Sequence, residues 1–243
     1  MLDVRTGLRC VARTWLVGAL MNTRGLQHLG HLYALNPGLT ALYPSPAALF
    51  RARARYMHNT HTHPHWVPLF AGIMLSLEEQ AATGRLAPET VDALQRTIAS
   101  TFSALGDSLF SGSLLATWVF ASIALLWQDH AAWAFGWTLL LFLALLAFRL
   151  ISFFAGLRQG MAILQQVKRL DCINWGYRFK FVNAVLLAFV FRLFLPAGAP
   201  MAWTFFVLAC FVGGGVLMGR FHAPRLLVCV AFLLAVLSAS SLL

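Results

Sequence analysis

The sequence predicts an all-α integral membrane protein, and two observations support this fold class. Hydrophobic residues make up 60% of the chain and charged residues only 11%, whereas soluble domains carry about 25% charged residues. A bilayer core of about 30 Å needs roughly 20 apolar residues as a helix, so long runs without Asp, Glu, Lys or Arg predict membrane spans. The charge-free runs are 108–128, 131–148, 193–219 and 226–243.

The N-terminal region, residues 1–63, is predicted to form amphipathic helices that lie in the membrane interface. Between Cys10 and Ala19, apolar and polar residues alternate with helical spacing. Basic amphipathic helices of this kind place arginines against anionic lipid headgroups. A small water-soluble cap is the alternative interpretation. The prolines expected to divide the rest of the region into short pieces are Pro37, Pro44 and Pro46.

Residues 64–112 are predicted to contain two short, broken elements that enter the bilayer without crossing it and meet near its midplane. The first, 64–77, is apolar but interrupted by proline and glycine, and as a helix it would reach only about 21 Å. The second, 97–112, is interrupted by glycines. A polar spacer at 79–96 separates them. Short, interrupted apolar segments are typical of transporters that hold a solute inside the membrane.

About five transmembrane helices are predicted in the region 113–243. The loop 157–180 carries several lysines and arginines, whereas the loops QDHAA and PAGAP carry none. By the positive-inside rule this asymmetry places the N-terminal region and 157–180 in the cytoplasm, and it accounts for the net charge of +10 without a nucleic-acid partner. Arg149, near the end of an apolar run, is expected to snorkel to the interface. The predicted spans are 113–128, 131–150, 181–195, 201–219 and 226–243.

A cluster of histidines precedes the first apolar element and raises the question of a metal site. Neutral imidazole suits zinc, nickel and copper. Pro64 interrupts both the strand and the helix geometry that would align these side chains, and no cysteine or carboxylate is close in sequence. We expect one or two histidines to hydrogen-bond a polar ligand or the backbone, with metal binding as the alternative. The cluster comprises His58, His61, His63 and His65.

Three carboxylates mark the two predicted broken elements. Glu78 and Glu79 are adjacent, and since neighbouring helix positions point about 100° apart, one would face a pocket and the other water. A solvated helix end is the alternative. Asp107 lies among apolar and small residues, and an intramembrane carboxylate indicates a functional site. The alternative is that Asp107 caps a helix that starts at Ser108.

Several classes of function lack their residues in this sequence. We find no catalytic triad, no CxxC pair and no phosphate-binding loop, so neither a catalytic residue nor a cofactor is expected. No cleavable signal peptide is expected, because residues 1–60 hold many arginines but no long apolar core. The cysteines are far apart in sequence and are expected to be free thiols: Cys10, Cys172, Cys210 and Cys229.

The sequence contains the motifs MNTRGLQHLGHLYALNPGLTALYP, HTHP, SLEEQ and STFSALGDSLFSG in this order. In this order they resemble the motifs of the IID membrane component of mannose/fructose/sorbose-type phosphotransferase systems, over about residues 8–165 and more loosely beyond. HTHP (His61 to Pro64), Gly72-Ile73 and SLEEQ correspond to the family's FNTHP motif, GI turn and A-x-EE end, and STFSALGDSLFSG corresponds to its GPLAGIGD block. His61 stands where the family has asparagine, and SALGD replaces a glycine-rich block. The stretch MNTRGLQHLGHLYALNPGLTALYP carries the family's first pattern at Asn22, Gln27, Leu29, Gly30, Tyr33, Pro37, Leu42 and Tyr43.

The resemblance implies a sugar permease subunit in a bacterial plasma membrane. A IID subunit pairs with a IIC subunit, and a trimer of such pairs forms the path for a hexose-type sugar. The phosphoryl group arrives on separate cytoplasmic IIA and IIB proteins, so the resemblance implies no phosphorylated residue in this chain. Two other function classes stay open: a metal-ion transporter or sensor built on the histidine cluster, and a non-transporting membrane scaffold that kept the fold.

We predict that the substrate-binding residues line one polar cavity that opens toward the IIC partner. Buried polar groups need partners, and a hydroxyl-rich sugar supplies both donors and acceptors. The residues predicted to line this cavity are His63, Glu78 or Glu79, and Asp107, with Asn22 close by.

Overall fold

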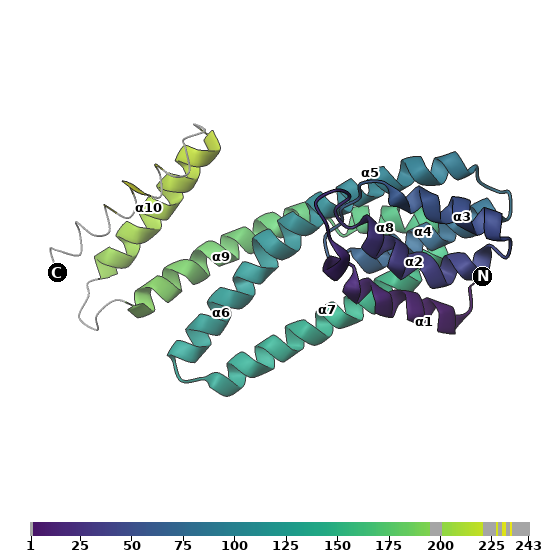
Figure 1. Cartoon of the computed structure of the whole chain (residues 1–243). Coiled ribbons are helices and arrows are strands. Elements are labelled where there is room, and N and C mark those ends of the chain that lie inside the picture. Colours follow the sequence, from purple (N-terminus) through teal and green to yellow (C-terminus); the bar gives the residue numbers. More distant parts are fainter. Residues whose placement is uncertain (1, 195–200, 221–226, 228–229, 232–233, 235–243) are drawn as a thin grey trace. The chain divides into compact units, whose positions relative to one another are not determined.

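The computed structural model describes residues 2–194 and 201–220, together with positions 227, 230, 231 and 234. Within these residues the chain is helical, with two isolated β-bridges and no strand, which confirms the predicted all-α class. The chain divides into two compact units, which are described separately (Figure 1). The first unit comprises Met1–Leu115 and Thr138–Tyr177, and the second comprises Ala116–Trp137 and Arg178–Leu243.

The first unit holds the N-terminal helices together with parts of two longer helices, α7 (Ala131–Gln159) and α9 (Cys172–Phe194). Short 3₁₀ turns link several of the helices; they span Thr14–Leu16, Gly18–Leu20, Arg55–Met57 and Gly160–Ala162. The helices that lie wholly in the first unit are α1 (Val4–Arg13), α2 (His28–Leu42), α3 (Pro46–Ala54), α4 (Val67–Ala82), α5 (Pro88–Gly106) and α8 (Ile163–Arg169).

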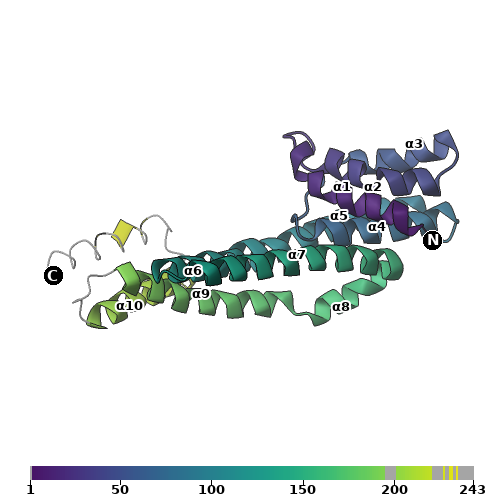
Figure 2. The ribbon, with the colours of Figure 1, turned by 90° about the horizontal axis from the view of Figure 1, so that it is seen from below.

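Helix α4 is the centre of the first unit. Every residue of α4 from Val67 to Leu75 is buried, and α1, α2, α5 and the turn at Gly160–Ala162 pack against it. Figures 1 and 2 show α4 within the group of helices that includes α1, α2 and α5. Each fully buried large apolar side chain contributes about 1.5–3 kcal/mol to stability. The largest are Trp66, Phe70, Phe102 and Phe153.

The break predicted within 64–77 is wrong, because this segment leads into an unbroken helix, α4. Pro68 lies in the first turn of α4, where its missing N–H leaves no helical hydrogen bond unmade. Gly72 is a packing residue: a Cβ there would lie 2.2 Å from the carbonyl oxygen of Phe153 in α7. Gly156 in α7 is its counterpart, since a Cβ there would lie 2.8 Å from the carbonyl oxygen of Leu69. The two glycines let the backbones of α4 and α7 touch.

The break predicted within 97–112 is also wrong. Helix α5 continues into a π-helical segment, Asp107–Leu114, and then into α6 (Leu115–Trp127) without interruption. The wider i→i+5 pattern of a π-helix carries one extra residue in the turn and keeps the backbone hydrogen-bonded. Gly112 lies within this segment. The glycines therefore accompany a change in helix type, where the sequence suggested a chain break.

The N-terminal region is helical as predicted, with one difference at Pro37. This proline lies inside α2, although it was expected to end a helix. Without an N–H, Pro37 leaves the carbonyl oxygen of Tyr33, four residues earlier, without its helical donor. Arg13 from α1 supplies a replacement, because its Nη1 donates to Tyr33 O at 3.3 Å. The guanidinium also lies 4.6 Å from the centre of the Tyr33 ring.

Two stretches of the described residues are long and apolar enough to cross a membrane, Pro88–Trp127 and Ala131–Phe194. The helix α10 (Met201–Arg220) contains a shorter apolar stretch, Met201–Gly214. These stretches fit a membrane protein, but the count of five spans is not confirmed. The predicted span 226–243 lies outside the described residues, apart from single positions within it.

In the second unit, a buried hydrogen bond joins α6 and α9. Thr117 Oγ1 donates to Asn183 Oδ1 at 2.7 Å, and both side chains are buried. Further along the same two helices, the Trp127 and Phe194 rings lie 4.3 Å apart. Since both contacts advance in the same direction along the chain, these parts of α6 and α9 run parallel. A hydrogen bond between apolar helices fixes their register.

Candidate functional site

His63 is held in place by two hydrogen bonds and a stacked ring. Its Nδ1 accepts a hydrogen bond from the N–H of His65 at 3.3 Å, so the neutral ring carries its proton on Nε2, 3.0 Å from Ser111 Oγ. The ring stacks on Phe110 with centroids 5.2 Å apart. Burial lowers the pKa of His63 and lowers the pKa of His65 to about 4, so both are neutral near pH 7. His63 therefore holds the π-helical segment against the HTHP loop.

Two glutamines anchor the other side of the HTHP loop. Gln27 Oε1 accepts from the N–H of Thr62 at 2.9 Å, and the N–H of Gln27 donates to Thr60 O at 2.9 Å. Gln95 in α5 donates to Thr60 Oγ1 at 3.2 Å. Gln27 and Gln95 are almost fully buried. In the sequence, Gln27 is notable only as part of a motif, and no pattern there indicates that Gln95 contacts this loop.

Arg149 in α7 also holds the loop, and the expectation that it snorkels is wrong. Only 5% of its surface is exposed. Its Nη1 donates to the carbonyl oxygen of Pro64 at 2.6 Å, its Nη2 donates to Thr14 Oγ1 at 3.3 Å, and the guanidinium lies 4.1 Å from the centre of the Trp15 ring. Its Nε finds no partner among the described residues. A buried cation in an apolar helix is costly, so this contact set marks a position with a specific task.

Asp107 does not cap a helix that starts at Ser108. Its backbone has ordinary helical angles, and it is the first residue of the π-helical segment that continues α5. The carboxylate is exposed and borders a cavity of about 460 Å³ beside α5. It also favours the charged form of His63, although burial outweighs that effect on the His63 pKa. Polar residues that line the cavity are Asn59, Thr60, His61, Arg96, Ser100, Ser103 and Asp107.

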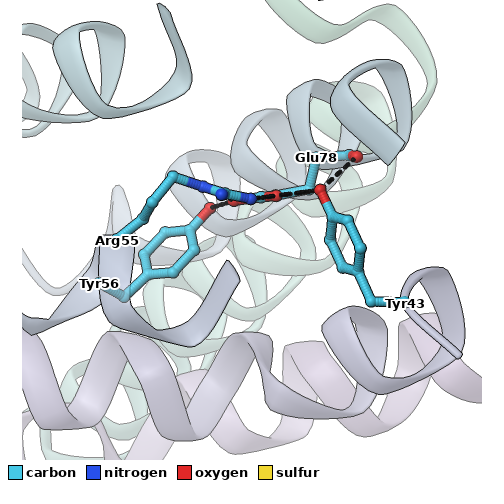
Figure 3. Close-up of polar contacts among 4 residues, drawn as sticks. All are labelled: Tyr43, Arg55, Tyr56 and Glu78. Atoms are coloured by element: carbon cyan, nitrogen blue, oxygen red, sulfur yellow. Dashed lines mark hydrogen bonds and ion pairs between the residues drawn. The ribbon is translucent and has the colours of Figure 1, made fainter. Parts of the chain in front are cut away.

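Glu78 has a different environment from the one predicted for it. Its carboxylate is fully buried and forms an ion pair with Arg55, whose Nε donates to Oε1 at 3.1 Å. Tyr56 donates to Oε1 at 2.9 Å and Tyr43 donates to Oε2 at 2.7 Å, as Figure 3 shows. Burial and the nearby carboxylate raise the pKa of Tyr43 to about 12 and that of Tyr56 well above its usual value. These contacts connect three elements: the end of α2, the turn that follows α3, and helix α4.

The predicted site residues do not gather in one cavity. Asn22 forms a turn, in which its Oδ1 accepts from the N–H groups of Arg24 and Gly25, both at 3.0 Å. Its buried Nδ2 has no partner within the described structure. Glu79 is half-buried beside Glu78. Of the predicted residues, only Asp107 lines the cavity, with His63 behind it.

The histidine cluster does not converge on a common point. His58 lies 4.0 Å from Asp92, and His61 lines the cavity near Asp107, whereas His63 faces Ser111. In the described part of the chain, no group of three or more His, Cys, Asp or Glu side chains is arranged to hold a metal ion.

One comparison with known proteins identifies a family, and two solved structures share the fold. A family model described as PTS system mannose/fructose/sorbose family IID component matches residues 2–178. A solved structure titled "Structure of membrane protein" has a TM-score of 0.70 at 18% identity and covers 99% of this chain and 97% of its own. "CryoEM Structure of Mannose Transporter ManYZ and Microcin E492 (MceA) complex" has a TM-score of 0.57 at 17% identity, with the same coverages.

These two structures show the fold alone, because their identities are low. A search of curated proteins gave no match. The family model, in contrast, spans most of the chain and includes both the HTHP loop and the Asp107 segment. The chain therefore belongs to the IID components of the mannose/fructose/sorbose family of the phosphotransferase system (PTS).

Proposed function

We propose that this protein is the IID subunit of a sugar permease and forms the translocation path together with a IIC subunit. The family match over residues 2–178 is the observation that carries the proposal. The apolar helices fit a membrane subunit, and a structure with a similar fold is titled as a mannose transporter. The proposed complex is a trimer of IIC–IID pairs that receives phosphoryl groups from IIA and IIB proteins.

The proposed substrate is a hexose-type sugar, and the cavity beside α5 is its candidate contact surface on this subunit. Asp107 accepts hydrogen bonds from hydroxyl groups, Arg96 donates them, and Ser100 and Ser103 do both. His63 supports this surface from behind through Ser111. Glu78 holds the fold together. Asn22 and Glu79 stay as candidates for contacts to the sugar or to the IIC subunit.

The proposed location is the bacterial plasma membrane with the N-terminal region in the cytoplasm. The basic loop 157–180 supports this orientation. Single cysteines introduced at Ala132 and Ala162 test it, in a chain whose native cysteines are replaced. We expect a membrane-impermeant thiol reagent added to intact cells to label only position 132. Equal labelling at both positions would contradict this topology.

Sugar uptake tests the function itself. Cells that contain the IIC, IIA and IIB partners but lack this chain are expected to take up and phosphorylate hexose only when the chain is supplied. The IIC subunit is expected to co-purify with it. If the chain inserts into the membrane but neither binds IIC nor restores uptake, it is a scaffold that kept the fold and lost the transport role.

A further inference from the structure

Helix α1 and the turns that follow it carry three distinct faces. One face is buried in the first unit and recurs with helical spacing at Gly7, Cys10, Val11, Thr14 and Val17. A Cβ on Gly7 would lie 3.1 Å from the Phe154 ring, so this face packs closely against α7. The buried face accounts for the attachment of α1 and leaves two other faces to explain.

The second face is apolar and exposed. Val4 is 66% exposed, Leu8 49% and Leu16 49%, and Trp15 is half exposed. The exposed stripe continues along the next turn with Leu20 and Met21. Apolar side chains left in a contiguous row mark a surface that is covered by something. We call Val4, Leu8, Trp15, Leu16, Leu20 and Met21 the apolar stripe.

The third face is basic. Arg5, Arg9 and Arg13 recur every four residues beside the apolar stripe. Arg13 is partly engaged by Tyr33, whereas the side chains of Arg5 and Arg9 are exposed. The sequence from residue 1 to Leu77 contains one acidic residue, Asp3, which caps α1 by accepting from the N–H of Thr6 at 3.1 Å. The charge beside the apolar stripe is thus almost purely positive.

We propose that this face of α1 binds anionic phospholipid: the apolar stripe enters the acyl boundary while Arg5 and Arg9 contact lipid phosphates. As a helix of 10 residues, α1 reaches only about 15 Å and is too short to cross a bilayer, so an apolar stripe on it lies along the membrane surface. Arginine beside an apolar stripe that includes tryptophan is the pattern of interfacial helices. Lipid binding here is independent of the proposed transport role.

Charge favours a lipid surface over a protein partner as the occupant. Interface cores between proteins are depleted of charge, whereas the exposed Arg5 and Arg9 lie beside the part of the stripe that α1 carries. Anionic headgroups match this charge, and each basic residue near such a surface strengthens binding about fivefold. If a protein covered the stripe, the environment of the stripe would not change with lipid charge. This difference distinguishes a protein partner from a lipid surface experimentally.

The test uses the full chain in nanodiscs of phosphatidylcholine mixed with increasing phosphatidylglycerol. An environment-sensitive fluorescent amino acid is placed at Leu8, and in a control protein at Glu89, an exposed position at the start of α5. We expect the emission at Leu8 to shift to the blue, and to be quenched by brominated acyl chains, as phosphatidylglycerol rises. The probe at Glu89 is expected to show neither change.

Two double variants distinguish charge from folding. Arg5→Gln with Arg9→Gln is expected to raise the phosphatidylglycerol fraction needed for the half-maximal shift by about 25-fold, or to abolish the shift. Arg5→Lys with Arg9→Lys keeps the charge and is expected to respond like the parent protein. An unchanged thermal midpoint shows that each variant is folded. A Leu8 probe that reports water in every lipid mixture, or an apolar site regardless of lipid charge, would overturn the proposal.

Discussion

Arg149 donates a 2.6 Å hydrogen bond to the carbonyl oxygen of Pro64, a residue 85 positions earlier in the chain. This contact ties an apolar helix to the HTHP loop, which was identified from its sequence. The same guanidinium reaches Thr14 and lies over Trp15, so one side chain connects three separate segments of the first unit. The position of the histidines therefore depends on α7 as much as on their own loop.

Arg149→Met is expected to destabilise the protein by about 1–3 kcal/mol, because it removes the charge-assisted hydrogen bond to the Pro64 carbonyl oxygen while keeping most of the apolar stem. The measurement is the thermal midpoint in detergent. Arg158→Met is the control, since Arg158 is exposed in the last turn of the same helix and its loss costs at most about 1 kcal/mol. A methionine variant as stable as the parent would show that the desolvation free energy of the buried guanidinium is as large as the free energy gained from its hydrogen bonds.

Glu78→Gln is expected to lower the free energy of unfolding by about 3–5 kcal/mol, because Arg55 would keep its charge in a largely enclosed place without its counter-ion. Chemical unfolding in detergent measures the change. Glu79→Gln, one residue on and half-buried, should cost less. Replacing both partners, Glu78→Met with Arg55→Met, should recover part of the loss. A double variant no better than the single one would assign the stability to the tyrosine hydrogen bonds.

Gly106→Ala is expected to destabilise the protein by about 1–3 kcal/mol, since the added Cβ would lie 2.2 Å from the Cβ of His63. The loop has to move, which should also loosen the contact between His63 and Ser111. Gly136→Ala is the matched control: no atom lies within 4 Å of its Cβ position, and alanine favours helix by about 1 kcal/mol. Equal midpoints for the two variants would show that the loop yields without cost.

Asp107→Asn tests the cavity. It keeps the shape but replaces charge-assisted hydrogen bonds with neutral ones, so uptake with the IIC partner present should fall about tenfold while membrane insertion stays normal. Asp129→Asn removes a charge at a position of φ 59°, which asparagine tolerates, and should transport normally. Because Asp107 does not cap a helix, near-normal uptake by the Asn variant would remove it from the site.

The buried His31 predicts acid sensitivity. Burial lowers the pKa of His31 to about 3, against about 6.5 in the unfolded chain. Between these values the unfolded chain binds the additional proton, so the free energy of unfolding falls as pH falls, by at most about 1.4 kcal/mol per unit. Above pH 6.5 this residue adds no pH dependence. His31→Phe should flatten the stability profile between pH 6.5 and 4, whereas His130→Gln, at an exposed position, should not. Parallel profiles for His31→Phe and the parent would contradict this.

The sequence was sufficient for the fold class and for several helix boundaries. The start of α5 at Pro88 follows a local signal, because proline is favoured in the first turn of a helix. Gly72 was misread as a break because its role depends on α7, a distant segment that no local pattern reveals. Proline and glycine occur where helices end, where they begin and where two helices touch, so their presence in a sequence does not show which of these roles they have.

The site was predicted less well than the fold. Asp107 was singled out because a carboxylate among apolar residues is visible in the sequence, and in the structure it borders a cavity. Glu78 looked equally exceptional, yet its partners Arg55, Tyr43 and Tyr56 come from other elements and enclose it completely. Burial with partners and exposure toward a ligand produce the same sequence signal, so only tertiary contacts separate them.

The close approach of α4 and α7 at Gly72 and Gly156 limits how the sequence can vary. Where two side chains meet, a change on one helix is compensated by a change on the other, as a smaller residue makes room for a larger one. Here each glycine faces the main chain of the opposite helix, and no amino acid is smaller. A larger residue at one glycine therefore cannot be compensated by a smaller residue at the other. The surrounding apolar residues can replace one another during evolution, whereas neither glycine at this crossing point can be replaced by a residue with a side chain.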